Sequence, residues 1–131
     1  MDKIVDLAER IYATVVDDDP SPFLSLCAAD AVISYPATGL LPYGGSWQGR
    51  EGIAAFLEAH DSAEEILVFE PIEMVPNGGT VIVIGHFEGR AKPAGGVWST
   101  RFVHLLAFEA GLLQRWEALF DTAAALEARA R

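Results

Sequence analysis

The sequence predicts an α+β fold, a cone-shaped barrel in which three N-terminal helices pack on a strongly curved, mixed but mostly antiparallel sheet. Three observations predict it. Apolar residues recur at helical spacing through most of the first 60 residues, they alternate strictly in most of the runs from there to residue 121, and turns rich in Gly separate those runs. Helices that precede an antiparallel sheet cover one of its faces, so a bent sheet of this kind encloses a conical pocket.

Composition narrows the classes of function. A chain of 131 residues is expected to form one domain, spanning 1–131. Its net charge of −10 argues against nucleic acid or an anionic membrane surface as a partner, because both need a basic patch. The single cysteine, Cys27, permits no intrachain disulfide, and no apolar run reaches the length of about 18 residues that spans a bilayer. Since the charged N-terminus does not read as a signal peptide, we expect a cytoplasmic protein.

The first half of the chain is predicted to be mainly helical. Residues 2–16 have an apolar stripe at helical spacing with Asp2 as the N-cap, and Ser21 followed by Pro22 indicates the start of a short helix. Between the second and third helices we expect a strand that Pro36 ends, and then an apolar loop that folds over something. The predicted elements are helices at 2–16 and 22–28, a strand at 31–35, the loop 37–48 and a helix at 51–60.

The second half is predicted to be a four-stranded meander followed by a short helix. Residues 63–75 form a long strand that we expect to bulge near Pro71, and 76–79, a Pro-Asn-Gly-Gly sequence, is a strong hairpin turn into a strand at 80–90. Residues 97–121 form two strands joined at the Glu-Ala-Gly turn 109–111. Asp121 then caps a helix at 122–130.

The alternation within these strands suggests which groups meet. His104 shares a strand face with Trp98, Phe102 and other large apolar residues, so its imidazole must find a hydrogen-bond partner or take part in chemistry. His86 and Glu88 share one face of the preceding strand and are expected to approach His104. The opposite sheet face would then be an apolar patch, which predicts a homodimer. That patch comprises Val81, Val83, Phe87, Val103 and Leu105.

Three stretches resemble the nuclear transport factor 2-like superfamily, and within it the SnoaL-like polyketide cyclase and ketosteroid isomerase group. They are 27–36 (CAADAVISYP), 47–57 (WQGREGIAAFL) and 102–121, which includes His104 and the Gly111 turn. The resemblance covers almost the whole chain. It implies an apolar conical cavity, a homodimer through the sheet and no metal or organic cofactor, but it does not fix a reaction, because the fold hosts enzymes, carriers and structural domains.

The resemblance also exposes departures at the catalytic positions. The general base of the isomerases, just before the proline that ends the first strand, corresponds to Tyr35, and the catalytic Asp of the cyclases in the last strand corresponds to Ala118. The cyclase histidine matches His104. The isomerase tyrosine on the first helix lies near Tyr12, one residue out of register. An Arg and Asp pair of the related epoxide hydrolases is matched in position only by His86 and Glu88.

The candidate catalytic residues are His104, Glu88, His86 and Tyr35, and each has a structural alternative. His104 suits acid-base work near neutral pH but could equally be a core histidine bonded to backbone. A buried Glu88 would have a raised pKa, whereas at the strand end it would be solvated beside Arg90. Tyr35 could donate to an oxyanion or simply be a buried tyrosine. The candidate ligand-binding residues are Tyr12, Trp47, Phe56, Trp98, Phe102, Trp116 and Ala118.

Several of these residues also have plain packing explanations. Trp98 and Trp116 are core or cavity wall, Tyr43 and Trp47 either form a lid or plug the open end of the cone, and Asp121 is a helix cap rather than a catalyst. Three hypotheses follow. The first is a cofactor-independent enzyme that moves a proton on a small, largely apolar carbonyl or cyclic compound. The others are a small-ligand-binding module without chemistry, and a dimeric interaction domain with a filled cavity.

Overall fold

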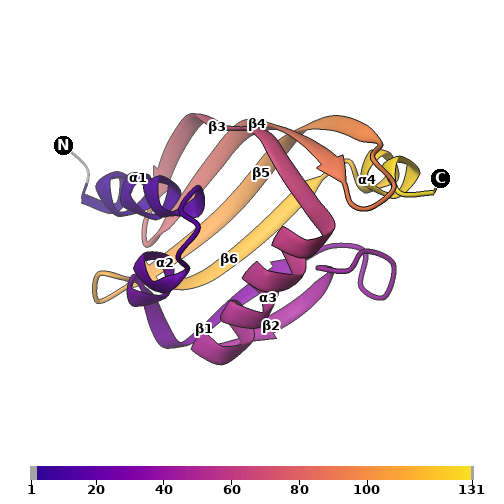
Figure 1. The fold of residues 1–131 in the computed structure, drawn as a ribbon. Helices are drawn as coiled ribbons and strands as arrows, with labels where there is room; N and C mark the ends of the chain where they lie inside the picture. Colours follow the sequence, from indigo (N-terminus) through magenta and orange to yellow (C-terminus); the bar gives the residue numbers. More distant parts are fainter. Residues whose placement is uncertain (1–2, 131) are drawn as a thin grey trace.

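The computed structural model describes residues 3–130, which form four helices and one curved sheet of six strands (Figure 1). The fold class predicted from the sequence is therefore confirmed. The helices are α1 (Lys3–Val15), α2 (Ser21–Ser25), α3 (Gly49–Ala63) and α4 (Thr122–Ala128). The strands are β1 (Cys27–Tyr35), β2 (Gly45–Gln48), β3 (Glu64–Asn77), β4 (Thr80–Ala91), β5 (Val97–Glu109) and β6 (Leu112–Phe120).

The sheet has the strand order β2-β1-β6-β5-β4-β3 and does not close into a full barrel. Strands β3 to β6 form the predicted antiparallel meander, whereas β1 pairs with β6 in parallel and with β2 antiparallel. Helices α1, α2 and α3 lie over one face of the sheet, and α4 packs at its far end beside β5 (Figure 1). The covered face and the three helices enclose the interior.

The helices follow their apolar stripes. In α1 the buried residues are Ala8, Ile11 and Tyr12, three or four positions apart, which places one face of the helix against the sheet. At α4 the carboxylate of Asp121 accepts a hydrogen bond from the backbone N–H of Ala124, so the predicted N-cap is confirmed. The proposed cap Asp2 lies outside the described residues.

Local irregularities give the sheet its bend and its turns. The β3–β4 register shifts between Pro71 and Glu73, as expected for a bulge at a strand proline, and again between Ile66 and Val68. The β5–β6 turn has positive φ at two successive positions, 52° at Ala110 and 80° at Gly111, as two-residue hairpins require.

Several predicted boundaries were wrong by a few residues. Helix α2 begins at Ser21 and ends at Ser25, so Ser21 is its first residue rather than its cap, and Asp19 accepts a hydrogen bond from the Ser21 N–H. Strand β1 begins at Cys27, four residues earlier than predicted. Helix α3 runs three residues beyond His60, and the short strand β2 forms where only loop was expected. Strand β2 is only four residues long, and its local sequence does not indicate its pairing with β1.

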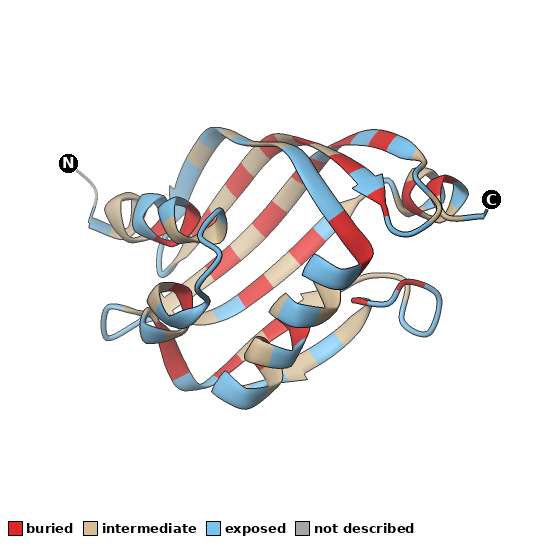
Figure 2. Ribbon diagram, viewed as in Figure 1, coloured by how far each residue is buried: buried red, intermediate tan, exposed pale blue. Residues whose placement is uncertain are grey.

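Burial alternates along the strands and shows which face lies inward (Figure 2). In β4 the backbone of Val83 is paired with that of His104, and the buried residues are Val81, Val83, Gly85, Phe87, Gly89 and Ala91. The prediction that Val81, Val83 and Phe87 belong to the outer face was therefore wrong. The outer face carries Ile82 and Ile84 in their place, beside Val103 and Leu105 of β5, which do lie outward as predicted.

Candidate functional site

A cavity of about 790 Å³ lies between the covered face of the sheet and helices α1 to α3. Aromatic side chains from both layers form much of its wall, including Phe69, Phe87 and Phe120. Four of the seven predicted ligand-binding residues line it as well, namely Phe56, Trp98, Phe102 and Trp116. Exposed carboxylates such as Asp17, Asp61 and Glu65 also belong to the lining. The wall is thus largely apolar inside, with acidic side chains where it meets solvent.

His104, on β5, is buried beneath this cavity and bonded to Tyr12 of α1. The Tyr12 hydroxyl lies 2.6 Å from His104 Nδ1, and the two rings stack with a 9° angle between their planes. Burial lowers the pKa of His104 to about 3 and raises that of Tyr12 well above its usual value, so both groups are neutral near pH 7. We assign the hydroxyl as the donor and Nδ1 as the acceptor, since no other hydrogen bond joins the Tyr12 hydroxyl to residues 3–130; the proton of His104 is then on Nε2.

Tyr35 and Trp116 supply two further hydrogen-bond donors at the cavity wall. The Tyr35 hydroxyl has no hydrogen-bond partner among the described residues, and burial raises its pKa, so it stays protonated. The indole N–H of Trp116 approaches that hydroxyl and partly offsets the rise in pKa, but its geometry falls short of a hydrogen bond. Within residues 3–130, Trp116 Nε1 is the only fully buried side-chain polar atom without a partner. A buried donor of this kind normally has an acceptor.

His60 is a site residue that sequence analysis missed. It lies in the last turn of α3, lines the cavity, and contacts the rings of Tyr43 and Phe56 at 4.6 Å and 6.0 Å between centroids. Burial lowers its pKa to about 4, opposed in part by the nearby Glu64 carboxylate. The signal existed in the sequence, because His60 is seven residues after Ile53 and four after Phe56, on the same inward stripe.

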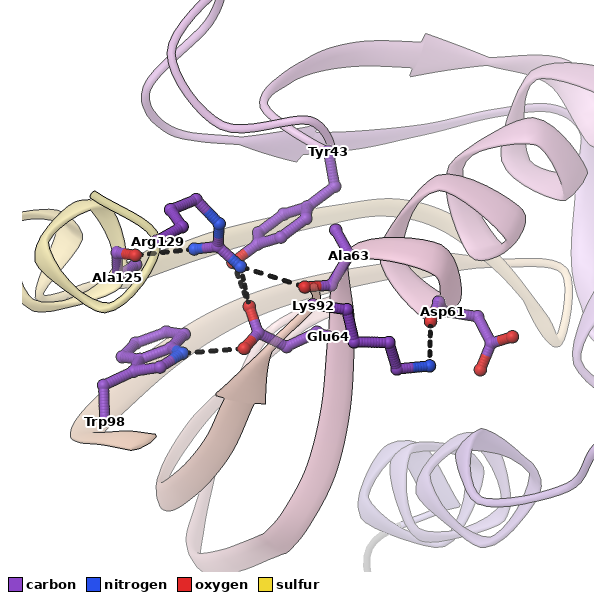
Figure 3. Close-up of polar contacts among 8 residues, drawn as sticks. All are labelled: Tyr43, Asp61, Ala63, Glu64, Lys92, Trp98, Ala125 and Arg129. Carbon is purple, nitrogen blue, oxygen red and sulfur yellow. Dashed lines mark hydrogen bonds and ion pairs between the residues drawn. The ribbon is translucent and has the colours of Figure 1, made fainter. Parts of the chain in front are cut away.

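Figure 3 shows a buried ion pair between Glu64, which lines the cavity, and Arg129. The Glu64 carboxylate, at the start of β3, accepts hydrogen bonds from Tyr43 at 2.9 Å, from Trp98 Nε1 at 2.8 Å and from Arg129 at 2.6 Å. Arg129 also donates to the backbone carbonyls of Ala63 and Ala125. Both oxygens of Glu64 are therefore engaged, and this carboxylate has a structural role. Its burial and its partner, 65 residues away, could not be foreseen from local pattern.

The predicted convergence of His86, Glu88 and His104 was wrong. The β4–β5 register places His86 opposite Arg101 and Glu88 opposite Ser99, on the outer face of the sheet, while Val83 is the residue opposite His104. The connection between the two strands sets this register, so even-numbered β4 residues pair with odd-numbered β5 residues. Neither His86 nor Glu88 lines the cavity. Of the four proposed catalytic residues, His104 and Tyr35 remain at the cavity.

The other predicted ligand-binding residues lie behind the wall. Tyr12 reaches the cavity only through His104, and Ala118 is buried opposite His104 on β6. Trp47 packs on Phe56 and donates from Nε1 to the carbonyl of Tyr43. Tyr43 itself is buried and donates to Glu64, so both side chains are packed against the rest of the protein.

The remaining reactive side chains give no sign of another centre. Cys27 is buried, its thiol lies 3.4 Å from the carbonyl oxygen of Phe23, and burial raises its pKa to about 11. Within residues 3–130 no group of three or more His, Cys, Asp or Glu side chains is arranged to hold a metal ion. None of the helices in this part of the chain is both long and apolar enough to cross a membrane.

Comparison with known structures places this cavity in a well-populated fold. An NTF2-like protein of unknown function from Burkholderia pseudomallei is 23% identical over the whole of both chains, with a TM-score of 0.90. TerC, co-crystallised with polyporic acid, is 27% identical over 97% of this chain and 98% of its own, with a TM-score of 0.83. A hypothetical protein with a ketosteroid isomerase-like fold from Catenulispora acidiphila, in complex with trimethylamine, is 19% identical over 93% and 90% of the two chains, with a TM-score of 0.79.

The sequence relationship agrees with the structural one. A search of curated proteins finds no match to the chain. The model of the SnoaL-like domain, however, matches residues 8–116, which include His60, His104, Tyr35 and most of the cavity wall. The chain therefore belongs to the SnoaL-like domain family, as the resemblance of its three sequence stretches indicated.

Proposed function

We propose that this protein is a cofactor-independent isomerase or cyclase that moves a proton on a small, largely apolar carbonyl or cyclic compound bound in the cavity. The observation that carries the proposal is the state of His104. Its ring is neutral, Tyr12 occupies Nδ1, and Nε2–H has no partner among the described residues. A neutral imidazole can donate to a carbonyl oxygen and stabilise the negative charge that develops there when a neighbouring C–H loses its proton.

The surroundings of His104 support the same chemistry. Tyr35 offers a hydroxyl without an acceptor among the described residues, and a ligand oxygen placed between it and His104 Nε2–H would accept from both. Because the wall is largely apolar, each such hydrogen bond is stronger than in solution. TerC, a structural relative, was crystallised with a small organic acid, which supports uptake of a small molecule in this fold.

The test is proton exchange at the carbon next to a carbonyl. Wild-type protein in D₂O is expected to exchange the α-protons of a bound ketone such as 2-tetralone faster than buffer alone, as followed by NMR. His104→Phe keeps a ring of similar size but removes the donor, and should slow exchange by about 100-fold, the usual loss for one oxyanion donor. Exchange at the wild-type rate in that variant would contradict the role given to His104.

A second candidate is a non-catalytic ligand-binding or interaction domain. It is favoured by Glu64, the buried carboxylate of the wall, whose oxygens are both engaged and cannot serve as a base. Binding of ketones without any exchange would favour this alternative. We also retain the homodimer as a proposal, now through an outer face with Ile82, Ile84, Val103 and Leu105 at its centre, and light scattering at micromolar concentration tests it.

A further inference from the structure

His60 is a neutral group that lines the cavity and has a ring nitrogen able to accept a proton. Neither of its ring nitrogens is hydrogen-bonded to a residue in the described part of the chain. Within residues 3–130, Trp116 Nε1 is the only side-chain polar atom that is both fully buried and without a partner. The unpaired nitrogens of His60 are therefore not fully buried, and their accessible surface faces the cavity that His60 lines. Its ring is held among aromatic rings, with Tyr35 and Phe87 each 6.3 Å away between centroids.

The charge state of His60 makes it an acceptor. Burial keeps the imidazole neutral near pH 7, which leaves one nitrogen with a free lone pair. The Glu64 carboxylate, already paired with Arg129, only partly offsets the effect of burial on the pKa of His60. A histidine whose pKa is about 4 is also about as basic as an ordinary glutamate, at ~4.3. It can therefore do the work of a carboxylate base while remaining uncharged.

The cavity thus combines donors and an acceptor. His104 Nε2–H and the Tyr35 hydroxyl come from the sheet, whereas His60 comes from the helix that covers it. A ligand held between sheet and helix meets both kinds of group. The best complement is a compound with an acceptor oxygen and an acidic hydrogen, such as an enolisable ketone or a phenol.

We propose that His60 is the hydrogen-bond acceptor of the cavity and, in the reaction proposed above, its base. The C–H bond beside the carbonyl breaks, its proton forms a bond to the free nitrogen of His60, and its electron pair forms the C=C of an enolate whose oxygen is held by His104 and Tyr35. Return of the proton to a different carbon restores neutral His60, so the isomerisation needs no oxidant or reductant. The base role rests on the proposed function, whereas the acceptor role does not.

The acceptor role is tested by binding alone, with 2-naphthol and its methyl ether 2-methoxynaphthalene as probes and tryptophan fluorescence as the readout. Both probes offer an oxygen to the donors, but only the naphthol offers an O–H. We expect wild type to bind 2-naphthol roughly 3- to 10-fold more tightly than the ether, since one hydrogen bond contributes about 0.5–1.5 kcal/mol. The ratio should fall to about one in His60→Phe.

Two further variants control this result. His60→Gln keeps an acceptor oxygen and should keep the preference for the naphthol, which rescues binding without restoring a base. Tyr35→Phe removes a donor and should weaken both probes alike, leaving their ratio unchanged. A preference that survives in His60→Phe, or failure of wild type to bind either probe, would overturn the inference. Urea unfolding of each variant confirms that it is folded.

The base role is tested by α-proton exchange of 2-tetralone in D₂O. We expect His60→Gln to bind the ketone but to lose exchange by at least about 100-fold, a typical contribution of general-base catalysis. Exchange that persists in this variant would show that another group is the base. If the naphthol preference behaves as predicted but bound 2-tetralone does not exchange even in wild type, the proposed catalysis fails and the acceptor role of His60 stands.

Discussion

Replacement of Arg129 by Met should destabilise the protein far more than its position near the C-terminus suggests. The Glu64 side chain is 0% exposed and that of Arg129 only 13%, and their closest atoms are 2.6 Å apart. The substitution leaves Tyr43 and Trp98 as donors to Glu64 but removes Arg129, the only cation within residues 3–130 that pairs with it (Figure 3). Breaking a buried pair from one side costs about 3–5 kcal/mol, because the remaining charge stays in a poorly solvating environment.

Arg90 supplies the matched control. It pairs with Glu65 at 3.1 Å, but both side chains are about half exposed, at 47% and 53%, so Arg90→Met should cost less than about 1 kcal/mol. For 131 residues, a loss of 3–5 kcal/mol corresponds to a fall in Tm of roughly 10–18 °C. Urea and thermal unfolding at pH 7 measure both variants.

The double variant Glu64→Gln/Arg129→Met shows how much of the stability lost in Arg129→Met comes from the unpaired charge of Glu64 and how much from the lost packing of the Arg129 side chain. With no carboxylate left to pair, the double variant should be more stable than Arg129→Met alone, since an amide can still bond to Trp98 and Tyr43. If Arg129→Met lost no more stability than Arg90→Met, the view of Glu64 as a buried charge that depends on Arg129 would be refuted.

Three other predictions concern stability. The pKa values of His104 and His60 are about 3 and about 4 in the fold, against about 6.5 in the unfolded chain, so below pH 6.5 the unfolded chain binds more protons than the folded protein. The free energy of unfolding should therefore fall as pH drops from about 6.5 toward 4. His60→Phe should lessen this slope by about 1.4 kcal/mol per pH unit, as measured by urea unfolding at pH 7, 6 and 5. Gly85→Ala should cost several kcal/mol because the added Cβ would collide with the Glu70 carbonyl and the Phe102 ring, whereas Gly79→Ala meets only the Phe108 carbonyl at 3.5 Å and should cost less than about 1 kcal/mol; equal urea midpoints would contradict this. Asp121→Ala removes the cap of α4 and should cost about 1 kcal/mol, while an unchanged Tm would show that the hydrogen bond to Ala124 adds nothing.

The order of the main elements could be predicted from the sequence because each rests on a local signal. The stripe of α1, the turn at Gly111 and the cap at Asp121 are all read from residues close together in the chain. The faces of β4 could not be read in this way, because Val81 and Val83 alternate with Ile82 and Ile84 and either pair suits a core. What decides is the register with β5, which depends on where the connection at 92–96 begins and ends.

The site was predictable only in part for a related reason. His104 was identified because a lone imidazole among apolar residues is conspicuous, but its partner Tyr12 lies 92 positions away and the pairing has no local signature. His60 was overlooked because the third helix was taken to end there, although its place on the inward stripe indicated a cavity position. His86 and Glu88 were expected to approach His104 because they share one face of their strand, and only the strand register shows that they face away.

The neutral interior also constrains the chemistry that the cavity could perform. A carboxylate base that takes a proton becomes neutral, so the reaction only moves a negative charge to the substrate. A neutral base such as His60 becomes cationic, so the same step creates a pair of opposite charges inside a poorly polar wall. Their mutual attraction, about 3 kcal/mol at an assumed separation of ~6 Å and an effective dielectric constant of ~20, offsets part of that cost. The donors His104 and Tyr35 must supply the rest. On this reasoning, ketones whose α-protons are unusually acidic, such as those flanked by an aromatic ring or a second carbonyl, should exchange well above buffer, and simple aliphatic ketones of similar size should not.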